Sequence, residues 1–342
     1  MVTKLRKEIV SAQMEITNDV IGAWKSQILF ALDQLGIFDA LGKQPIRVPE
    51  LSLALNLPED PLRRLLNAAV AARYILKDGD RYSNALITQA VMTKESDGYL
   101  GNWLQMYARW YTTFSKLPQA IIEGKAMEDV NAAADENYNL IFIKGMTDYA
   151  NYRGRDILNY IDLSNANKLL DVGCGPGIYV AMFCATYPQL HCTCYDASQA
   201  LVLAKEHLKR EGFLDRVTFQ PGNYISDLSF GESQYDAVFL SHVLHQEDKA
   251  TCAIIVKKAF EALKAGGAII VQAMFLDDSE TSPLYASLHD LLSMLIFPHG
   301  RNYTYQQTIA FLTDAGFNNV RKKRMSLFNV NSLVLGDKGV GS

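Results

Sequence analysis

Residues 168–177 read KLLDVGCGPG, and this segment is the most informative one about the fold class. The apolar residues from Leu169 to Val172 predict a short buried strand, and the glycines at positions 173, 175 and 177 predict a tight turn directly after it. A segment of helix length follows the turn. Strand, glycine turn and helix in this order predict the first βα unit of a parallel sheet.

Four more short apolar segments lie downstream, and segments of helix length separate them. They are 191–196 (HCTCYD), 216–222 (RVTFQPG), 235–241 (YDAVFLS) and 267–273 (GAIIVQA). Alternating strands and helices predict right-handed crossovers and a parallel sheet with helices on both faces. The stretch 317–338 contains two strands with no helix between them, which predicts an antiparallel hairpin at the edge of the sheet. The basic run from Arg321 to Arg324 lies in that hairpin and is expected to face solvent.

Upstream, residues 3–115 show apolar residues at helical spacing, with one short extended interruption. A short helix is predicted over 48–57. A second helix, opened by the sequence from Pro58 to Pro61, is predicted to run to Leu76, before a hairpin turn at 77–80. Helix, helix and hairpin form a winged helix. We therefore predict two domains: a winged-helix-like domain over 1–115, and connecting helices followed by the α/β domain over 116–342.

The composition constrains the class of protein. The chain has 33 Lys and Arg against 37 Asp and Glu, for a formal net charge of −4. Winged helices often read DNA, but this mild acidity and the few cations of the second helix, Arg63, Arg64 and Arg73, favour a packing role over nucleic-acid binding. Gln272 interrupts the longest apolar run, and the first residues show no secretory signal, so we expect a cytoplasmic protein that does not interact with membranes.

Five cysteines, an odd number, occur at positions 174, 184, 192, 194 and 252. Cys192 and Cys194 lie in a predicted buried strand, and their spacing does not match that of a metal or redox motif. We expect reduced thiols in the core and no metal site.

The glycine turn and the end of the next strand carry the predicted nucleotide site. Gly173, Gly175 and Gly177 allow the backbone to approach a bound nucleotide closely. Asp196 follows Gly177 by nineteen residues, at the end of the second strand, where it can accept hydrogen bonds from both ribose hydroxyls. Its alternative role is to cap the helix that follows. Asp171 either steers a cationic group of the cofactor or fixes the glycine turn.

With these residues in place, the chain resembles the class I S-adenosylmethionine-dependent methyltransferases, and within them the small-molecule O-methyltransferases of plant caffeate, bacterial antibiotic and hydroxyindole type. LLDVGCGPG is similar to the cofactor loop of that family, and YDAS to its ribose-binding segment. PGNYIS is similar to the segment that holds the adenine end, with Asn223 in place of the usual Asp. The resemblance implies an S-adenosylmethionine site formed by these residues: Asp171, Gly173, Gly175, Gly177, Asp196, Ala197, Asn223, Tyr224 and Ser241.

The resemblance also implies a catalytic residue. Leu244-His245-Gln246-Glu247-Asp248 resembles the family's catalytic segment, so His245 is expected to be the general base. The sequence departs from the family pattern at Gln246, Ala273 and Asn302, positions that are often acidic. Glu247 or Asp248 could supply the missing carboxylate.

The family further implies a homodimer formed by the N-terminal domain and a pocket for a small hydroxylated acceptor. We expect this pocket to contain Trp103, Tyr107, Phe142, Met146, Tyr149, His242, Met294 and Phe297. The helical stripe that includes Trp103 and Tyr107 can instead serve packing or the dimer interface. Asp277 and Asp278 could bind a metal, as in catechol methyltransferases, but a solvated loop fits them better. The alternatives to O-methylation are methylation of an activated carbon, a winged-helix DNA-binding regulator, and a family member that binds the cofactor without transferring a methyl group.

Overall fold

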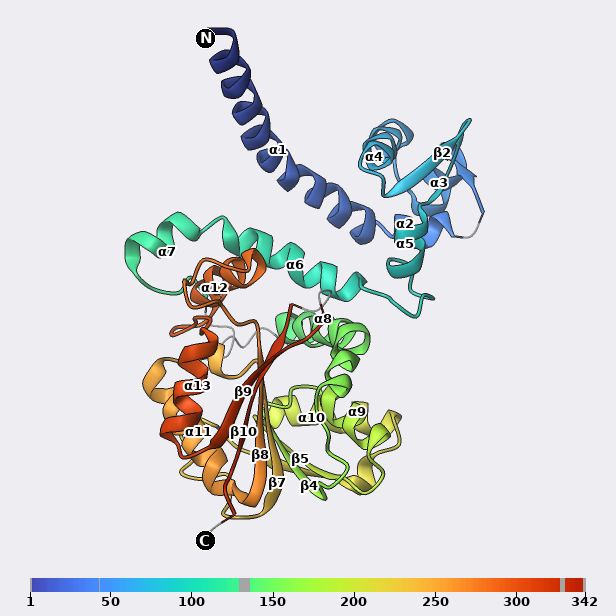
Figure 1. Cartoon of the computed structure of the whole chain (residues 1–342). Helices are drawn as coiled ribbons and strands as arrows, with labels where there is room; N and C mark the ends of the chain where they lie inside the picture. The colour runs from blue at the N-terminus through green and yellow to red at the C-terminus, as the bar shows by residue number, and fades with distance from the viewer. Residues whose placement is uncertain (1, 43, 129–135, 327–329, 341–342) are drawn as a thin grey trace. The chain divides into compact units, whose positions relative to one another are not determined.

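Two units of structure make up the chain (Figure 1). In this computed structural model, residues 2–42, 44–128, 136–326 and 330–340 are described. The first unit comprises Met1–Arg109 and Leu140–Asp148, and the second comprises Trp110–Asn139 and Tyr149–Ser342.

The first unit contains helices and a small antiparallel sheet with strand order β1-β3-β2. Its elements are α1 (Val2–Gln34), α2 (Ile37–Leu41), β1 (Ile46–Arg47), α3 (Val48–Leu55), α4 (Glu59–Ala71), β2 (Ile75–Asp78), β3 (Arg81–Asn84), α5 (Leu86–Val91) and most of α6 (Gly101–Phe114). The predicted order of helix, helix and hairpin is confirmed, and α4 buries Leu62 and Leu66 in the same core as Tyr82.

The predicted end of the second helix is wrong. Helix α4 ends at Ala71, five residues before Leu76, because Arg73 adopts a left-handed conformation with φ of 66°. This conformation breaks the helical hydrogen-bond ladder. Ile75, which fits the helical apolar pattern, belongs to β2 and is buried there.

A seven-stranded sheet forms the centre of the second unit, with strand order β6-β5-β4-β7-β8-β10-β9. The strands are β4 (Lys168–Val172), β5 (His191–Asp196), β6 (Val217–Pro221), β7 (Tyr235–Ser241), β8 (Leu263–Ala273), β9 (Asn318–Arg324) and β10 (Ser332–Asp337). Strands β4 to β8 pair in parallel, whereas β10 pairs antiparallel with both β8 and β9. The α/β fold with a final antiparallel hairpin is therefore confirmed.

Helices cover both faces of this sheet, as Figure 1 shows. The remaining elements are α7 (Leu117–Glu123), α8 (Glu136–Arg153), η1 (Gly154–Asn159), α9 (Ile178–Thr186), α10 (Ser198–Arg210), η2 (Leu214–Arg216), η3 (Leu244–Gln246), α11 (Lys249–Ala262), α12 (Leu284–Ile296) and α13 (Tyr305–Asp314). Helices α9 and α10 pack on one face through a core that includes Phe183 and Leu208. Helices α11 and α13 pack on the other through Val256 and Leu312.

The direction of strand succession reverses between β4 and β7. From β4 the chain proceeds outward to β5 and β6, then crosses back to β7 and continues to β8 on the other side. Ligands of open α/β sheets bind beyond the carboxyl ends of the strands at such a reversal. The glycine turn after Val172 and the segment after Ser241 both lie at this position.

The state of the cysteines agrees with the prediction from the sequence. All five cysteines are buried free thiols. The sulfur atoms of Cys184 and Cys192 lie 3.8 Å apart.

None of the helices within the described ranges is both long enough and apolar enough to cross a membrane.

Candidate active site

The turn between β4 and α9 is a glycine loop in which three residues require a left-handed backbone. Gly173, Gly175 and Gly177 have φ values of 72°, 52° and 71°. A Cβ at Gly173 would lie 2.7 Å from Cγ2 of Val243, so this glycine permits close packing against the segment after β7. A Cβ at Gly175 would meet nothing within 4 Å. Gly175 therefore presents bare backbone to open space, as a loop that approaches a ligand must.

Asp196, at the end of β5, is hydrogen-bonded to the glycine loop. Its Oδ2 accepts from the backbone N–H of Gly175 at 2.8 Å, and its Oδ1 accepts from that of Ala197 at 2.7 Å. Helix α10 has no side-chain cap, so the alternative role of Asp196 as a helix cap is not observed. Each carboxylate oxygen has a second lone pair, so both oxygens can still accept a hydrogen bond from a ligand.

Asp171, in β4, is almost entirely buried, and its Oδ1 atom has no hydrogen-bond partner among the described residues. Burial, and then the charge of Asp196, raise the pKa of Asp171 well above its ordinary value. Oε1 of Gln272, near the end of β8, is another buried acceptor without a hydrogen-bond partner among the described residues. Gln272 donates from Nε2 to the Tyr179 hydroxyl at 2.7 Å.

These unpaired acceptors fit a ligand that carries a positive charge and N–H donors. A buried polar atom without a partner is costly unless a ligand or water supplies one. S-adenosylmethionine has a sulfonium, an ammonium and a ribose diol, and the loop offers an open glycine face, two carboxylates and an amide oxygen. The residues present therefore fit this cofactor.

The predicted adenine-side segment is a turn held by its own side chains. Asn223 is exposed, and its Oδ1 accepts from the backbone N–H groups of Ile225 and Ser226. Lys258 of α11 is buried and donates to the backbone carbonyls of Tyr224 and Asp227 at 2.5 and 2.8 Å. The sequence did not point to Lys258, because its residue type does not distinguish it from the exposed Lys257 beside it.

His245 lies in η3, directly after the end of β7, and its side chain is buried. Burial, followed by the neighbouring His289 and His242 rings, holds the pKa of His245 well below its ordinary value of 6.5. Its ring centroid lies 5.1 Å from that of His289, 5.6 Å from that of His242 and 5.4 Å from that of Phe297. This histidine is therefore neutral at pH 7 and has aromatic neighbours.

His242 links the strand end to this cluster. It has a left-handed φ of 57°, and its backbone N–H donates to the carbonyl of Gln272 at 3.0 Å. A residue other than glycine in this conformation stores strain of order 1–3 kcal/mol, and such strain gathers at functional sites. Burial lowers the pKa of His242 to about 3.

The acidic residues that follow His245 have other hydrogen bonds. Glu247 accepts from the Tyr224 hydroxyl at 3.3 Å, and Asp248 caps α11 by accepting from the backbone N–H of Thr251. The Nδ1 atom of His245 instead lies 3.1 Å from Oγ of Ser293, in α12.

His289 and Ser293 are residues that the sequence reasoning missed. They are four residues apart in a mostly apolar helix, and polar residues at that spacing on a buried face could have been noticed. Gln272 offered a similar signal, because it interrupts the apolar run of β8.

The residues expected to bind the acceptor are divided between the two units. In the first unit, Trp103 and Tyr107 on α6 have ring centroids 4.0 Å apart. Phe142 and Met146 lie on α8, which approaches α6 closely where a Cβ on Gly145 would lie 3.1 Å from Met106. In the second unit are Tyr149, His242, Met294 and Phe297.

The ends of these helices are tied together by one carboxylate. Asp148 of α8 accepts hydrogen bonds from the backbone N–H groups of Asn102 and Trp103, in the first turn of α6. It also accepts from the side chain of Asn102 at 3.1 Å. These contacts satisfy N–H groups that a helix terminus otherwise leaves unpaired, and they fix Trp103 relative to α8 within the first unit.

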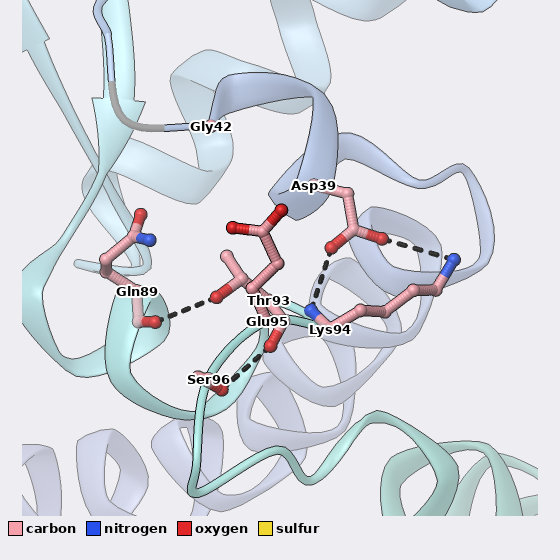
Figure 2. Close-up of a pocket in the computed structure, with 7 residues that line it drawn as sticks. All are labelled: Asp39, Gly42, Gln89, Thr93, Lys94, Glu95 and Ser96. Carbon is pink, nitrogen blue, oxygen red and sulfur yellow. Dashed lines mark hydrogen bonds and ion pairs between the residues drawn. The ribbon is translucent and has the colours of Figure 1, made fainter.

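Two other polar regions of the chain could be considered as binding sites. Asp277 accepts from the hydroxyls of Ser279 and Ser282, and no group of three or more His, Cys, Asp or Glu side chains among the described residues could hold a metal ion. The first unit has a pocket of about 790 Å³ whose lining includes Asp39, Gln89 and Lys94. Lys94 pairs there with Asp39 at 3.3 Å, and Figure 2 draws this ion pair. This pocket contains none of the residues predicted for cofactor or acceptor.

Comparison with known proteins places the chain in a family. Residues 124–318 match the O-methyltransferase domain family, and residues 19–94 match the O-methyltransferase dimerisation domain. The chain is 28% identical to 3-hydroxy-5-methyl-1-naphthoate 3-O-methyltransferase of Streptomyces sahachiroi, over 94% of each chain. It is 27% identical to acetylserotonin O-methyltransferase of Macaca mulatta, over 91% of this chain and 93% of that one.

A solved structure with the same fold contains the cofactor. Human N-acetylserotonin methyltransferase in complex with S-adenosylmethionine superposes with a TM-score of 0.85 at 25% identity, covering 96% of this chain and 98% of that chain. The domain matches, the near full-length relatives and the fold agree with one another. The chain belongs to the O-methyltransferase family and is an S-adenosylmethionine-dependent methyltransferase.

Proposed function

We propose that this enzyme methylates a hydroxyl group on a small aromatic metabolite and that His245 is its general base. The observation that carries this proposal is a buried, neutral histidine placed directly after β7, at the sheet reversal where the glycine loop lies. The two relatives described above are named for a hydroxynaphthoate and for acetylserotonin as substrates, and both compounds are aromatic.

The cofactor would be held by the glycine loop and the residues around it. Asp196 would accept from the ribose hydroxyls, with Ala197 beside it, and Asp171 would face the cationic end. Tyr224 and Asn223 would flank the adenine, and Ser241 would complete the site at the end of β7. When bound, S-adenosylmethionine supplies a methyl group on a positively charged sulfur, which is the electrophile.

His245 would remove the proton from the acceptor hydroxyl. A phenol has a pKa near ~10 and is mostly protonated at pH 7, so a base is needed as the oxygen attacks the methyl carbon. The imidazole of His245 would take the O–H proton as the oxygen bonds to the methyl carbon, and the electron pair of the broken C–S bond would stay on the sulfur of the cofactor. Because burial keeps the imidazole neutral, it is available to accept this proton at physiological pH.

The acceptor would bind beside His245 against aromatic and apolar side chains. Phe297 presents its ring at nearly a right angle to His245, at 88°. The other residues proposed from the same unit are Tyr149, His242 and Met294. A hydrophobic pocket with few polar groups suits a planar aromatic acceptor and holds its oxygen in line with the methyl group.

We also propose that the enzyme is a homodimer. The match to the dimerisation domain supports this assembly. So does the surface of α1, on which Ile16 and Trp24 are 65% and 66% exposed. Large apolar side chains gathered on one exposed helix are typical of an interface between subunits.

The direct test is product analysis with isotopically labelled methyl donor. The protein would be incubated with S-adenosylmethionine carrying a 13C-methyl group and, separately, with 3-hydroxy-5-methyl-1-naphthoate and N-acetylserotonin as phenolic probes. We expect a labelled methyl ether on at least one phenol, recognised by its fragmentation. A labelled methyl group on a ring carbon would instead establish C-methylation. The absence of labelled product with both phenols would contradict the proposed acceptor class.

A further inference from the structure

The ring of His245 is oriented by a hydroxyl. Its Nδ1 atom lies 3.1 Å from Oγ of Ser293, and the side chain of Ser293 is fully buried. The backbone around His245 is fixed as well, because its carbonyl accepts from the N–H of Arg301 at 2.9 Å. The nitrogen that would take the acceptor's proton must therefore be Nε2, the one that does not face Ser293.

His289 packs on the same hydroxyl, and Asn302 determines its tautomer. The Nδ2 group of Asn302 donates to the carbonyl of Ala286 at 2.8 Å, so its Oδ1 is the atom that faces Nδ1 of His289, at 3.0 Å. An amide oxygen only accepts. Neutral His289 therefore carries its proton on Nδ1, and this N–H also lies 3.4 Å from Oγ of Ser293.

The hydroxyl of Ser293 thus has imidazole nitrogens on two sides. Because the Nδ1–H of His289 is directed at Oδ1 of Asn302, His289 offers this hydroxyl no lone pair at Nδ1. The hydroxyl of Ser293 has a hydrogen and lone pairs of its own, so at 3.1 Å it can accept from an Nδ1–H of His245 or donate to an unprotonated Nδ1.

We propose that Ser293, with His289 anchored by Asn302, is the positioning group for His245: Oγ of Ser293 accepts the Nδ1–H of His245 and so leaves Nε2 unprotonated to serve as the base. This inference rests on the proposed role of His245. The family resemblance leads us to expect a carboxylate that orients the catalytic histidine. In this proposal a hydroxyl and a second imidazole orient it instead. Ser293 and His289 act through His245 and touch no reacting atom.

Positioning of this kind matters because a neutral imidazole has two tautomers and only one can accept a proton at Nε2. A histidine held in the wrong tautomer loses most of its catalytic value, as the serine protease triad illustrates. The hydroxyl also differs from a carboxylate in carrying no charge, so it orients the ring without favouring its protonated form. This agrees with the lowered pKa of His245.

The first test observes the tautomer directly. In the full-length protein labelled with 15N-histidine and saturated with S-adenosylhomocysteine, the ring nitrogen shifts of His245 distinguish a protonated from an unprotonated nitrogen. The signal is assigned by its loss in His245→Gln. We expect protonated Nδ1 and unprotonated Nε2 in the wild type, and a rise of the other tautomer in Ser293→Ala. A wild-type His245 with its proton on Nε2 would overturn the proposal whatever the activities are.

The second test separates positioning from packing through kinetics. In Ser293→Ala we expect kcat to fall at least about tenfold, which is a part of the ~10²–10⁴-fold that general base catalysis supplies, with little change in the Kd for S-adenosylmethionine. Ser293→Thr, which keeps the hydroxyl, should restore part of the rate. Ser287→Ala is the matched control, because Ser287 lies on the same helix and its hydroxyl donates to the backbone carbonyl of Pro283.

The outcomes distinguish this inference from the proposed function. If His245→Gln is inactive while Ser293→Ala has the wild-type kcat, the base assignment stands and the positioning role of Ser293 is wrong. If His245→Gln retains full kcat, the proposed function of His245 itself fails.

Discussion

At the residue scale, two glycines of one loop carry different constraints. Gly173 and Gly175 both have positive φ, but only Gly173 is pressed against a neighbour, since a Cβ placed on it would lie 2.7 Å from Val243. Gly175 faces open space and contributes its N–H to Asp196. Gly173 therefore allows the loop to pack closely against the segment after β7. Gly175 allows the backbone of the loop to approach the cofactor.

Alanine substitutions should separate these two roles. Both changes place a Cβ in a left-handed conformation, at a cost of roughly 1–2 kcal/mol. Gly173→Ala adds the contact with Val243, so we expect the larger fall in Tm for this variant. Gly175→Ala should weaken S-adenosylmethionine binding at least tenfold in calorimetry while lowering Tm less. Equal Tm values, or cofactor affinity unchanged in Gly175→Ala, would contradict the assignment.

At the element scale, the segment after β7, the short helix η3 and α12 bring together three histidines that remain neutral. Burial is the largest cause of the lowered pKa values of His242, His245 and His289. In the unfolded chain each ring takes up a proton near pH 6.5, whereas in the folded protein it does not. The contribution of these neutral histidines to the free energy of unfolding is therefore complete above pH 6.5. It is lost as the pH falls toward their pKa values in the folded protein.

This linkage predicts a dependence of stability on pH. The free energy of unfolding should decrease from pH 7 to pH 5.5, by as much as about 1.4 kcal/mol per pH unit for each histidine. The raised pKa values of Asp171 and Asp196 act in the opposite direction, because protonation of these carboxyls stabilises the folded state. Chemical denaturation of the wild type and of His289→Gln isolates one histidine, since both carboxyls are present in each. The variant should show the shallower slope, and identical slopes would refute the linkage for His289.

Most strands of the second unit could be predicted from the sequence, but the end of α4 and one partner of His245 could not. The five parallel strands, the final hairpin and the glycine loop follow from local pattern, because period, turn residues and strand length are all readable along the chain. The early end of α4 was not readable, because the apolar spacing continues past Arg73 while the backbone does not. Ser293 was missed as a partner of His245 because the two lie 48 residues apart and meet only through tertiary packing.

At the scale of the whole molecule, the first unit exposes an apolar helix that the fold of one chain leaves uncovered. Ile9, Met14, Ile16, Val20 and Trp24 on α1 are all large, apolar and exposed. The chain is also mildly acidic, with a net charge of −4, which does not favour nucleic acid as the partner of its winged-helix unit. A second copy of the chain, joined through the dimerisation domain, fits both facts.

Charge placed on this helix should therefore dissociate the dimer. We expect wild-type protein to sediment as a dimer of about twice the 38.2 kDa chain mass, and Ile16→Asp with Val20→Asp to sediment as a monomer. Asn18→Asp is the control, because it adds charge on the same helix at a polar exposed position. A monomeric wild type, or a double variant that remains dimeric at low micromolar concentration, would argue against this interface.

The role of His245 as general base is tested by comparing kcat and cofactor affinity in His245→Gln and the wild type. We expect S-adenosylmethionine to bind both proteins with Kd values within about threefold, because the glycine loop and Asp196 hold the cofactor. We expect kcat to fall at least about 100-fold, the lower end of what a general base contributes. A His245→Gln enzyme that binds the cofactor and methylates the phenol at the wild-type rate would contradict this role.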